Sequence, residues 1–165
     1  MLRLCEVCKD PVTRVVVSGR HDQTATKYFC YIHAIEAGVL DVPLPLLEPV
    51  AFETGYSVNA IIFALESLTR AGCIAEAEAA DQGAWRLSSA KTALELCVAL
   101  SQAAVERFQQ QAGLALNHWK ITRGKDLGAI LSALVRCGAL AVTTEVDMKP
   151  LEELSTMDGP LIVAA

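Results

Sequence analysis

Cys5-Glu-Val-Cys8 and Cys30-Tyr-Ile-His33 are two short pairs of residue types that commonly ligate metals, and 21 residues separate them. Tetrahedral zinc sites are usually assembled from two such pairs, because each pair comes from one tight turn and the chain between them folds back. Four protein ligands leave no open coordination position for a catalytic water. The spacing therefore predicts a closed structural site. The predicted ligands of its Zn²⁺ ion are Cys5, Cys8, Cys30 and His33.

The chain between the two pairs has the residues of a β-hairpin. Residues 12–17 and 24–29 are rich in β-branched and aromatic side chains, and glycine and aspartate lie between them. Residues 31–38 fit a short helix with the second ligand pair at its first turn. The order of knuckle, hairpin and helix resembles the treble-clef group of zinc folds. It predicts a zinc-binding module over residues 1–40.

Cysteine pairs of this kind have other common uses. A redox-active Cys-x-x-Cys pair follows a strand and opens a helix, whereas Pro11 and a strand candidate follow Cys8. A disulfide framework is the second alternative, since the chain has six cysteines, but we expect no secretory signal. His21 competes for the fourth position but falls in the expected hairpin turn, so His33 is preferred. The cysteines that lie in apolar helical patterns instead are Cys73, Cys97 and Cys137.

The composition predicts a cytoplasmic protein with a helical core and no membrane segment. Of its 165 residues 53% are apolar, and its mean hydropathy is +0.36. No uninterrupted apolar run approaches the roughly 20 residues that span a bilayer. The formal charge is -5. Residues 1–33 hold five Lys and Arg against three Asp and Glu, and the remainder holds nine against sixteen. A mildly basic module on an acidic body disfavours general electrostatic binding of nucleic acid.

A proline-rich stretch marks the expected domain boundary. Three prolines in residues 43–49 remove amide donors and bias the residues before them away from the α region. Residues 41–51 are therefore predicted to form an extended linker. A helical domain is expected over residues 52–154, followed by a tail over residues 155–165.

Apolar residues in the second domain recur at helical spacing. The expected helices run from Ser57 to Gly72, from Ser88 and Ser89 to about Gln111, from Gly113 to Trp119, and from Asp126 as cap to Gly138. Residues after Thr143 are expected to be loosely ordered, apart from a turn near residues 149–154. The apolar stripe of the second helix includes Leu94 and Val98. The predicted core contains Leu65, Leu68, Leu94, Phe108, Trp119, Ile130, Leu131 and Leu134.

An internal echo links two helix ends. Leu68-Thr-Arg-Ala-Gly-Cys-Ile74 and Leu134-Val-Arg-Cys-Gly-Ala-Leu140 both read as a last helical turn, a glycine stop and an aliphatic residue folding back. Winged-helix domains end their third helix this way, with a ribbon as the wing. Residues 73–87 are then either a β-ribbon or a loop between helices. The expected fold is mainly α with a small β part, and its body is winged-helix-like or another helical arrangement that reuses this ending.

Two resemblances to known families extend this interpretation. About residues 52–154 resemble an uncharacterised bacterial family, which implies a fold neighbourhood and no established activity. The stretches that carry this resemblance are Phe63-Ala-Leu-Glu-Ser-Leu68, Val105-Glu-Arg-Phe108, Leu116-Asn-His-Trp-Lys-Ile-Thr-Arg-Gly-Lys-Asp-Leu-Gly128 and the helix ending at Leu140. Where the family has Gly, Gly and Phe, this chain has Gln109, Lys120 and Leu127.

The second resemblance concerns residues 5–34. They resemble the Cys-x-x-Cys…Cys-x-x-His-Ala start of zinc-binding activators of bacterial protein-arginine kinases and of related stress-response adaptors. The resemblance implies a zinc site and a role in binding another protein.

The motifs favour a binding protein over an enzyme. The sequence has no phosphate-cradling glycine loop, no G-x-S-x-G elbow and no H-E-x-x-H pair. We therefore expect a non-catalytic adaptor that binds another protein. The expected partner surface on the hairpin comprises Arg14, Val15, Val17, Arg20 and Lys27. The alternative is a ribosome- or RNA-associated protein that adds phosphate contacts from Lys120, Arg123 and Lys125.

Overall fold

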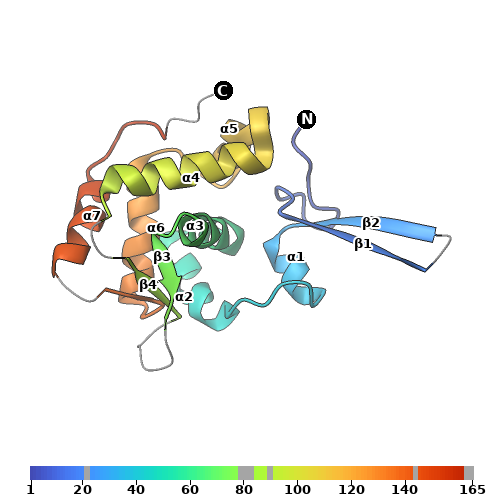
Figure 1. Cartoon of the computed structure of the whole chain (residues 1–165), viewed down its shortest axis with the longest axis horizontal. Coiled ribbons are helices and arrows are strands. Elements are labelled where there is room, and N and C mark those ends of the chain that lie inside the picture. Colours follow the sequence, from blue (N-terminus) through green and yellow to red (C-terminus); the bar gives the residue numbers. More distant parts are fainter. Residues whose placement is uncertain (21–22, 78–83, 89–90, 143–144, 162–165) are drawn as a thin grey trace. The chain divides into compact units, whose positions relative to one another are not determined.

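The computed structural model describes residues 1–20, 23–77, 84–88, 91–142 and 145–161 (Figure 1). The chain divides into two compact units, Met1–Val42 and Pro43–Ala165. No helix within the described residues has the length and apolar character needed to cross a membrane.

The first unit is a hairpin followed by a short helix. Strands β1 (Arg14–Arg20) and β2 (Gln23–Phe29) pair antiparallel, with Arg14 opposite Phe29. Helix α1 (Tyr31–Glu36) begins directly after Cys30. Two residues beyond its end, Gly38 adopts a φ of +70°, a left-handed conformation that glycine tolerates because it has no Cβ to clash. The predicted order of knuckle, hairpin and helix is present in this unit.

The second unit is mainly helical and has a small three-stranded sheet. Its elements are α2 (Leu44–Thr54), α3 (Val58–Arg70), β3 (Ile74–Glu76), β4 (Trp85–Leu87), α4 (Ala93–Phe108), η1 (Gln109–Gln111), α5 (Ala112–His118), α6 (Gly124–Arg136), β5 (Leu140–Ala141) and α7 (Glu145–Ser155). The sheet order is β3-β4-β5, so the central strand is flanked by strands from two distant parts of the chain.

The two similar sequence segments, residues 68–74 and 134–140, have the same structure. At the end of α3 the Cys73 N–H bonds to the Leu68 carbonyl at 2.8 Å, and at the end of α6 the Ala139 N–H bonds to the Leu134 carbonyl at 2.9 Å. Both endings are Schellman motifs around a left-handed glycine. Each delivers the chain to one side of β4, through β3 in antiparallel and β5 in parallel pairing. Residues 73–87 therefore include a β-ribbon, although residues 78–83 at its tip lie outside the described part.

An aromatic cluster lies in the core of this unit. The ring centroids of Phe63 and Trp119 are 4.8 Å apart, and Phe108 lies 5.7 Å from Trp119. The predicted core residues that are buried are Leu65, Leu68, Phe108, Trp119, Ile130, Leu131 and Leu134.

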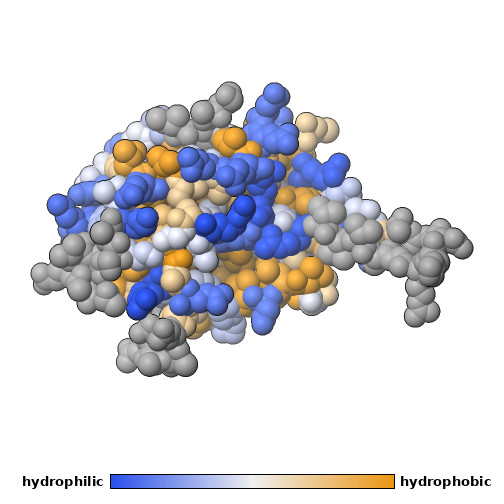
Figure 2. All heavy atoms as spheres, viewed as in Figure 1, coloured by the Kyte–Doolittle hydropathy of each residue, from blue (hydrophilic) through white to orange (hydrophobic). Residues whose placement is uncertain are grey.

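The prediction for Leu94 and Val98 was wrong. Leu94 is 64% exposed and Val98 is 43% exposed. Helix α4 carries two overlapping apolar stripes, and the stripe that includes Leu96 and Leu100 is the one that is fully buried. Periodicity alone could not choose between them, because both have helical spacing. Apolar patches accordingly lie among hydrophilic ones on the face in view (Figure 2).

The predicted linker over residues 41–51 was also wrong, since most of it belongs to α2. Two of its prolines are compatible with a helix start, where amide donors have no helical partner. Pro49 lies inside the helix and removes one backbone bond. Burial of Leu47 and Val50 offsets that loss, and the Arg136 Nε donates to the Glu53 carboxylate at 2.6 Å, joining α2 to α6.

The region after Thr143 was expected to be loosely ordered, but residues 145–155 form α7. Its buried Leu151 and Leu154 pack the helix against α6 despite Pro150 in its interior. The predicted tail is likewise anchored up to Leu161, whose N–H donates to the Thr122 carbonyl at 2.8 Å.

Two helix starts differ from the sequence prediction. Thr92, not Ser88, caps α4, and it forms a reciprocal capping box with Glu95; Ser89 lies outside the described residues. Asp126 lies in the first turn of α6 instead of before it, where its carboxylate accepts the Arg123 N–H at 2.8 Å.

We predict that Gly128→Ala destabilises the second unit by about 1–3 kcal/mol through overpacking. A Cβ at Gly128 would lie 2.9 Å from the Leu154 Cβ and 3.1 Å from the backbone of α7. Urea unfolding followed by tryptophan fluorescence measures this unit, because Trp85 and Trp119 both belong to it. Gly113→Ala is the control, since its Cβ meets nothing within 4 Å. It is expected to be neutral or stabilising by up to about 1 kcal/mol, and equal destabilisation by both variants would contradict this packing.

Candidate metal centre

Four metal-ligand side chains converge in the first unit, and they are the four predicted from the sequence. Their ligand atoms all lie within 4.8 Å of one another. The Cys30 Sγ lies 3.1 Å from the His33 Nδ1 and 3.5 Å from the Cys8 Sγ, and the Cys5 Sγ lies 3.6 Å from the same ring nitrogen. The structure therefore contains a cluster of three thiols and one imidazole that is compatible with a metal site. His21 lies outside the described residues.

The first ligand pair is held by a tight turn. The Cys5 N–H donates to the Asp10 carbonyl at 2.7 Å, and the Lys9 N–H donates to the Cys5 carbonyl at 3.1 Å. Lys9 has a φ of +66°, a left-handed conformation that reverses the chain. The Glu6 N–H donates to the Tyr28 carbonyl at 3.2 Å, which ties this turn to β2 just before the second pair.

The second pair comes from one helical start. Cys30 occupies the N-cap position of α1, and His33 follows three residues later. Residues three apart on a helix lie on the same face. The spacing of three residues at a helix start thus puts the Cys30 and His33 side chains on the same side, facing the turn that carries Cys5 and Cys8.

The surroundings of Cys5 favour its thiolate. Burial by itself raises the pKa of this thiol, but hydrogen bonds from the backbone of Cys8, Cys30 and Val7, and from the Cys8 side chain, lower the pKa from 9.0 to about 7. Cys5 and Cys30 are buried while Cys8 is exposed at the edge of the cluster. A thiolate is the form that ligates a metal.

The donor set and its spacing fit a tetrahedral ion. With metal–sulfur bonds of about 2.3 Å, two sulfurs of a tetrahedral site lie about 3.8 Å apart. The Cys8 and Cys30 sulfurs lie 3.5 Å apart, and all four ligand atoms lie within 4.8 Å of one another, which is close to that geometry. All six cysteines are free thiols, so the disulfide alternative does not describe this structure.

His33 has a neighbouring carboxylate that the sequence reasoning missed and that could orient its ring. Its Nδ1 faces the sulfurs, and its Nε2 lies 3.7 Å from the Glu36 carboxylate. A carboxylate on the second ring nitrogen fixes the orientation of a ligating histidine. The signal was present in the sequence, because Glu36 follows His33 by one helical turn.

The predicted hairpin surface is only partly described. Lys27 is exposed. Arg14 is half-buried, with its guanidinium 5.4 Å from the ring centroid of buried Tyr31, so it also contributes to packing. Val15, Val17 and Arg20 belong to β1, but their side chains lie outside the described part.

The basic residues of the second unit are partly neutralised. Asp158 pairs with Lys125 at 2.5 Å and with Arg123 at 3.5 Å, while Lys120 is exposed. Hydrogen bonding and attraction from Lys125, with a smaller effect of Arg123, hold the pKa of Asp158 below its usual value. The two cations therefore share a counter-ion within the protein.

Comparison with protein-family models, with curated proteins and with solved structures found no match to this chain. The resemblances described from the sequence therefore remain predictions. The interpretation of the cluster depends on the chemistry and geometry of its four side chains.

We predict that the protein binds one Co²⁺ with the visible absorption of tetrahedral thiolate coordination. Cys30→Ser should abolish that spectrum, because Cys30 contacts two other ligands. Cys137→Ser is the matched control, since Cys137 is half-buried in the second unit and lies near Glu53. A spectrum that survives Cys30→Ser, or that is lost equally in Cys137→Ser, would contradict this ligand set.

Proposed function

We propose that the first unit binds one Zn²⁺ through Cys5, Cys8, Cys30 and His33. The observation that supports this is the convergence of four donor atoms within 4.8 Å. Three thiolates and one imidazole in tetrahedral arrangement are a common structural zinc set. The order of knuckle, hairpin and helix, which is that of treble-clef modules, supports the same proposal. Thiols stay reduced in the cytoplasm, where we expect the module to act.

We propose further that the protein is a non-catalytic adaptor. A zinc ion held by four protein ligands has no position left for substrate or water, so its role would be structural. Such a site stabilises a small module whose surface can then bind a partner. Exposed Leu4, Val7 and Lys27 lie on the same unit as the site and offer apolar and basic contacts.

A protein is the preferred partner. RNA or the ribosome remains the alternative, because exposed cations such as Lys27 and Lys120 could contact phosphates. Two of the cations that this alternative requires, Arg123 and Lys125, already pair with Asp158. Their internal neutralisation favours the protein partner.

Zinc release by acid is the first prediction of this proposal. The folded Cys5 pKa of about 7 lies below the unconstrained 9.0, so the fold favours the thiolate and this contribution is lost as the pH falls through 7. Protons then compete with the metal. Because a bound metal itself holds the thiolates deprotonated, zinc content after dialysis should decrease only at a pH well below 7, while tryptophan fluorescence, which reports the second unit, stays unchanged. Full zinc retention under strongly acidic conditions would contradict the assignment.

The adaptor role predicts that Lys27→Glu weakens capture of a protein partner by about two- to fivefold, as expected for one surface charge. The measurement is affinity capture from nuclease-treated lysate, quantified against the wild-type protein. Lys149→Glu makes the same charge change at an exposed site in α7 and should have no effect.

Both variants should keep one zinc per chain. Two outcomes would overturn the adaptor proposal. One is capture that disappears on nuclease treatment, which would support nucleic-acid binding. The other is turnover of a small molecule by the purified protein, because a structural site offers no catalysis.

A further inference from the structure

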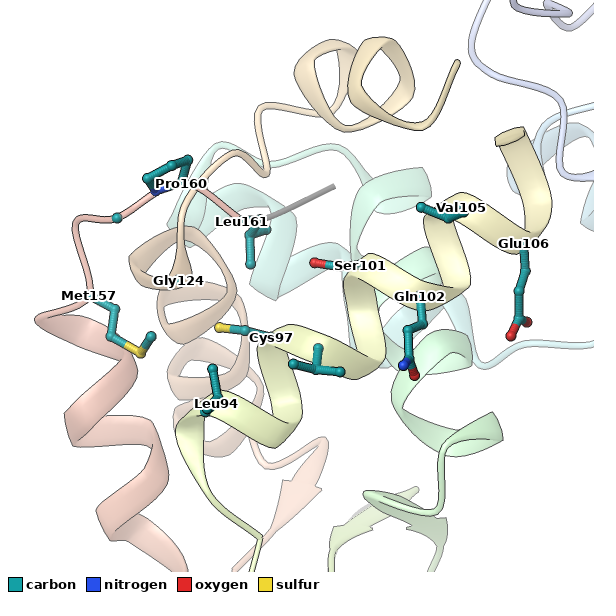
Figure 3. A pocket seen from close by; sticks show the side chains of 12 residues that line it. Leu94, Cys97, Ser101, Gln102, Val105, Glu106, Gly124, Met157, Pro160 and Leu161 are labelled. Carbon is teal, nitrogen blue, oxygen red and sulfur yellow. The ribbon is translucent and has the colours of Figure 1, made fainter. Parts of the chain in front are cut away.

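The second unit has an apolar groove beside α4, with a volume of about 650 Å³ (Figure 3). We call it the α4 groove. Its lining from α4 consists of Leu94, Cys97, Val98, Ser101, Gln102, Val105 and Glu106. The opposite side is formed by Gly124 at the start of α6 and by residues 157–161. The exposed apolar side chains of α4, Leu94 and Val98, line this groove.

The lining residues on α4 recur at every third or fourth position from Leu94 to Glu106. The twelve steps from residue 94 to residue 106 of the helix correspond to a length of about 18 Å. The groove is therefore an elongated site whose long direction follows the helix.

The opposite side is anchored, so the groove is preformed. A Cβ at Gly124 would lie 2.7 Å from the Met157 Cβ, which shows how closely the two segments approach. The Lys125 N–H donates to the Met157 carbonyl at 3.0 Å, and the Leu161 N–H donates to the Thr122 carbonyl at 2.8 Å. Backbone bonds at both ends thus hold residues 157–161 against the start of α6.

One polar group inside the groove has no partner. Ser101 is only 7% exposed, and no hydrogen bond to its hydroxyl is present among the described residues. In Figure 3 its oxygen points into the groove, between Cys97 and Leu161. The hydroxyl oxygen is not itself among the fully buried atoms, so water can reach it from the groove, and an apolar molecule that displaced this water would leave the hydroxyl without a partner. A ligand oxygen in the groove would provide the hydrogen bond.

The charges of the lining select an uncharged ligand. Glu106 is the one charged residue among the lining residues that the structure describes, and Arg70 lies 3.4 Å from its carboxylate. No lysine or arginine lines the described groove to receive an anionic head group. A carboxylate placed there would lose its hydration without gaining a counter-ion.

We propose that the α4 groove binds an uncharged, elongated apolar molecule whose single polar oxygen hydrogen-bonds the Ser101 hydroxyl. Long-chain alcohols, ketones and esters belong to this class. The volume of about 650 Å³ lies within the range of small-molecule pockets. An α-helix about 10 Å wide and 18 Å long has a volume of roughly 1,400 Å³, so the groove could take one face of a partner helix but could not enclose it.

The test compares 1-decanol with decanoate, which share one alkyl chain and differ in charge. Binding to the full-length protein is measured by isothermal titration calorimetry at a pH where decanoate is ionised. We expect saturable binding of one 1-decanol per chain, and at least about tenfold weaker binding of decanoate. Equal affinity for the two, or no saturable binding of 1-decanol, would overturn the proposal.

Three variants locate the site. Ser101→Ala should weaken 1-decanol binding by about three- to tenfold, the value of one hydrogen bond. Val98→Glu places a charge in the groove and should abolish binding. Leu114→Glu is the matched control, because Leu114 is 56% exposed on α5 and does not line the groove. Tryptophan fluorescence checks that each variant is folded.

Unchanged affinity in both Ser101→Ala and Val98→Glu would show that the alcohol binds elsewhere, and would overturn the assignment. Sedimentation provides a second criterion. If the wild-type protein self-associates, fails to bind 1-decanol and becomes monomeric with Val98→Glu, the groove is an interface between copies of the chain and not a small-molecule site.

Discussion

The convergence of three thiols and an imidazole is the interaction on which the first unit depends. That unit has 42 residues, close to the size of about 40 at which a hydrophobic core alone rarely supports a fold. Its fully buried side chains in the described part include Cys5 and Cys30 themselves, together with Tyr31 and Ala34. The ligands are thus also the core. Any ion they bind would contribute directly to the folding free energy of the unit.

The second unit is stabilised by a different constraint. Glycines at the ends of α3 and α6 reverse the chain, so that β3 and β5 reach opposite sides of β4. The rings of Phe63 on α3, Phe108 at the end of α4 and Trp119 at the end of α5 contact one another. Glycine also lets α7 approach α6 closely at Gly128. The buried core of this unit does not include any of the four clustered metal-ligand side chains.

The two units therefore present chemically distinct surfaces. The first combines soft metal-ligand side chains with five basic and five acidic residues, whereas the second presents an apolar groove within an acidic body. Soft thiolates favour soft metal ions, and an apolar groove without lining cations favours uncharged molecules. Because the residues that form each site belong to one unit, substitutions in one can be made without touching the other.

The sequence by itself determined which four metal-ligand side chains cluster, because the spacing of two residues within each pair is a local property of a knuckle and of a helix start. It also determined where α3 and α6 end, since a left-handed glycine is a local signal. The position of Glu36 near the His33 ring could also have been predicted, because the two residues are one helical turn apart. Tertiary structure alone decided the helical state of residues 44–54 and 145–155, where burial of Leu47, Val50, Leu151 and Leu154 outweighs the interior prolines. It also decided which stripe of α4 is buried, because both stripes have helical spacing and only packing against other helices distinguishes them.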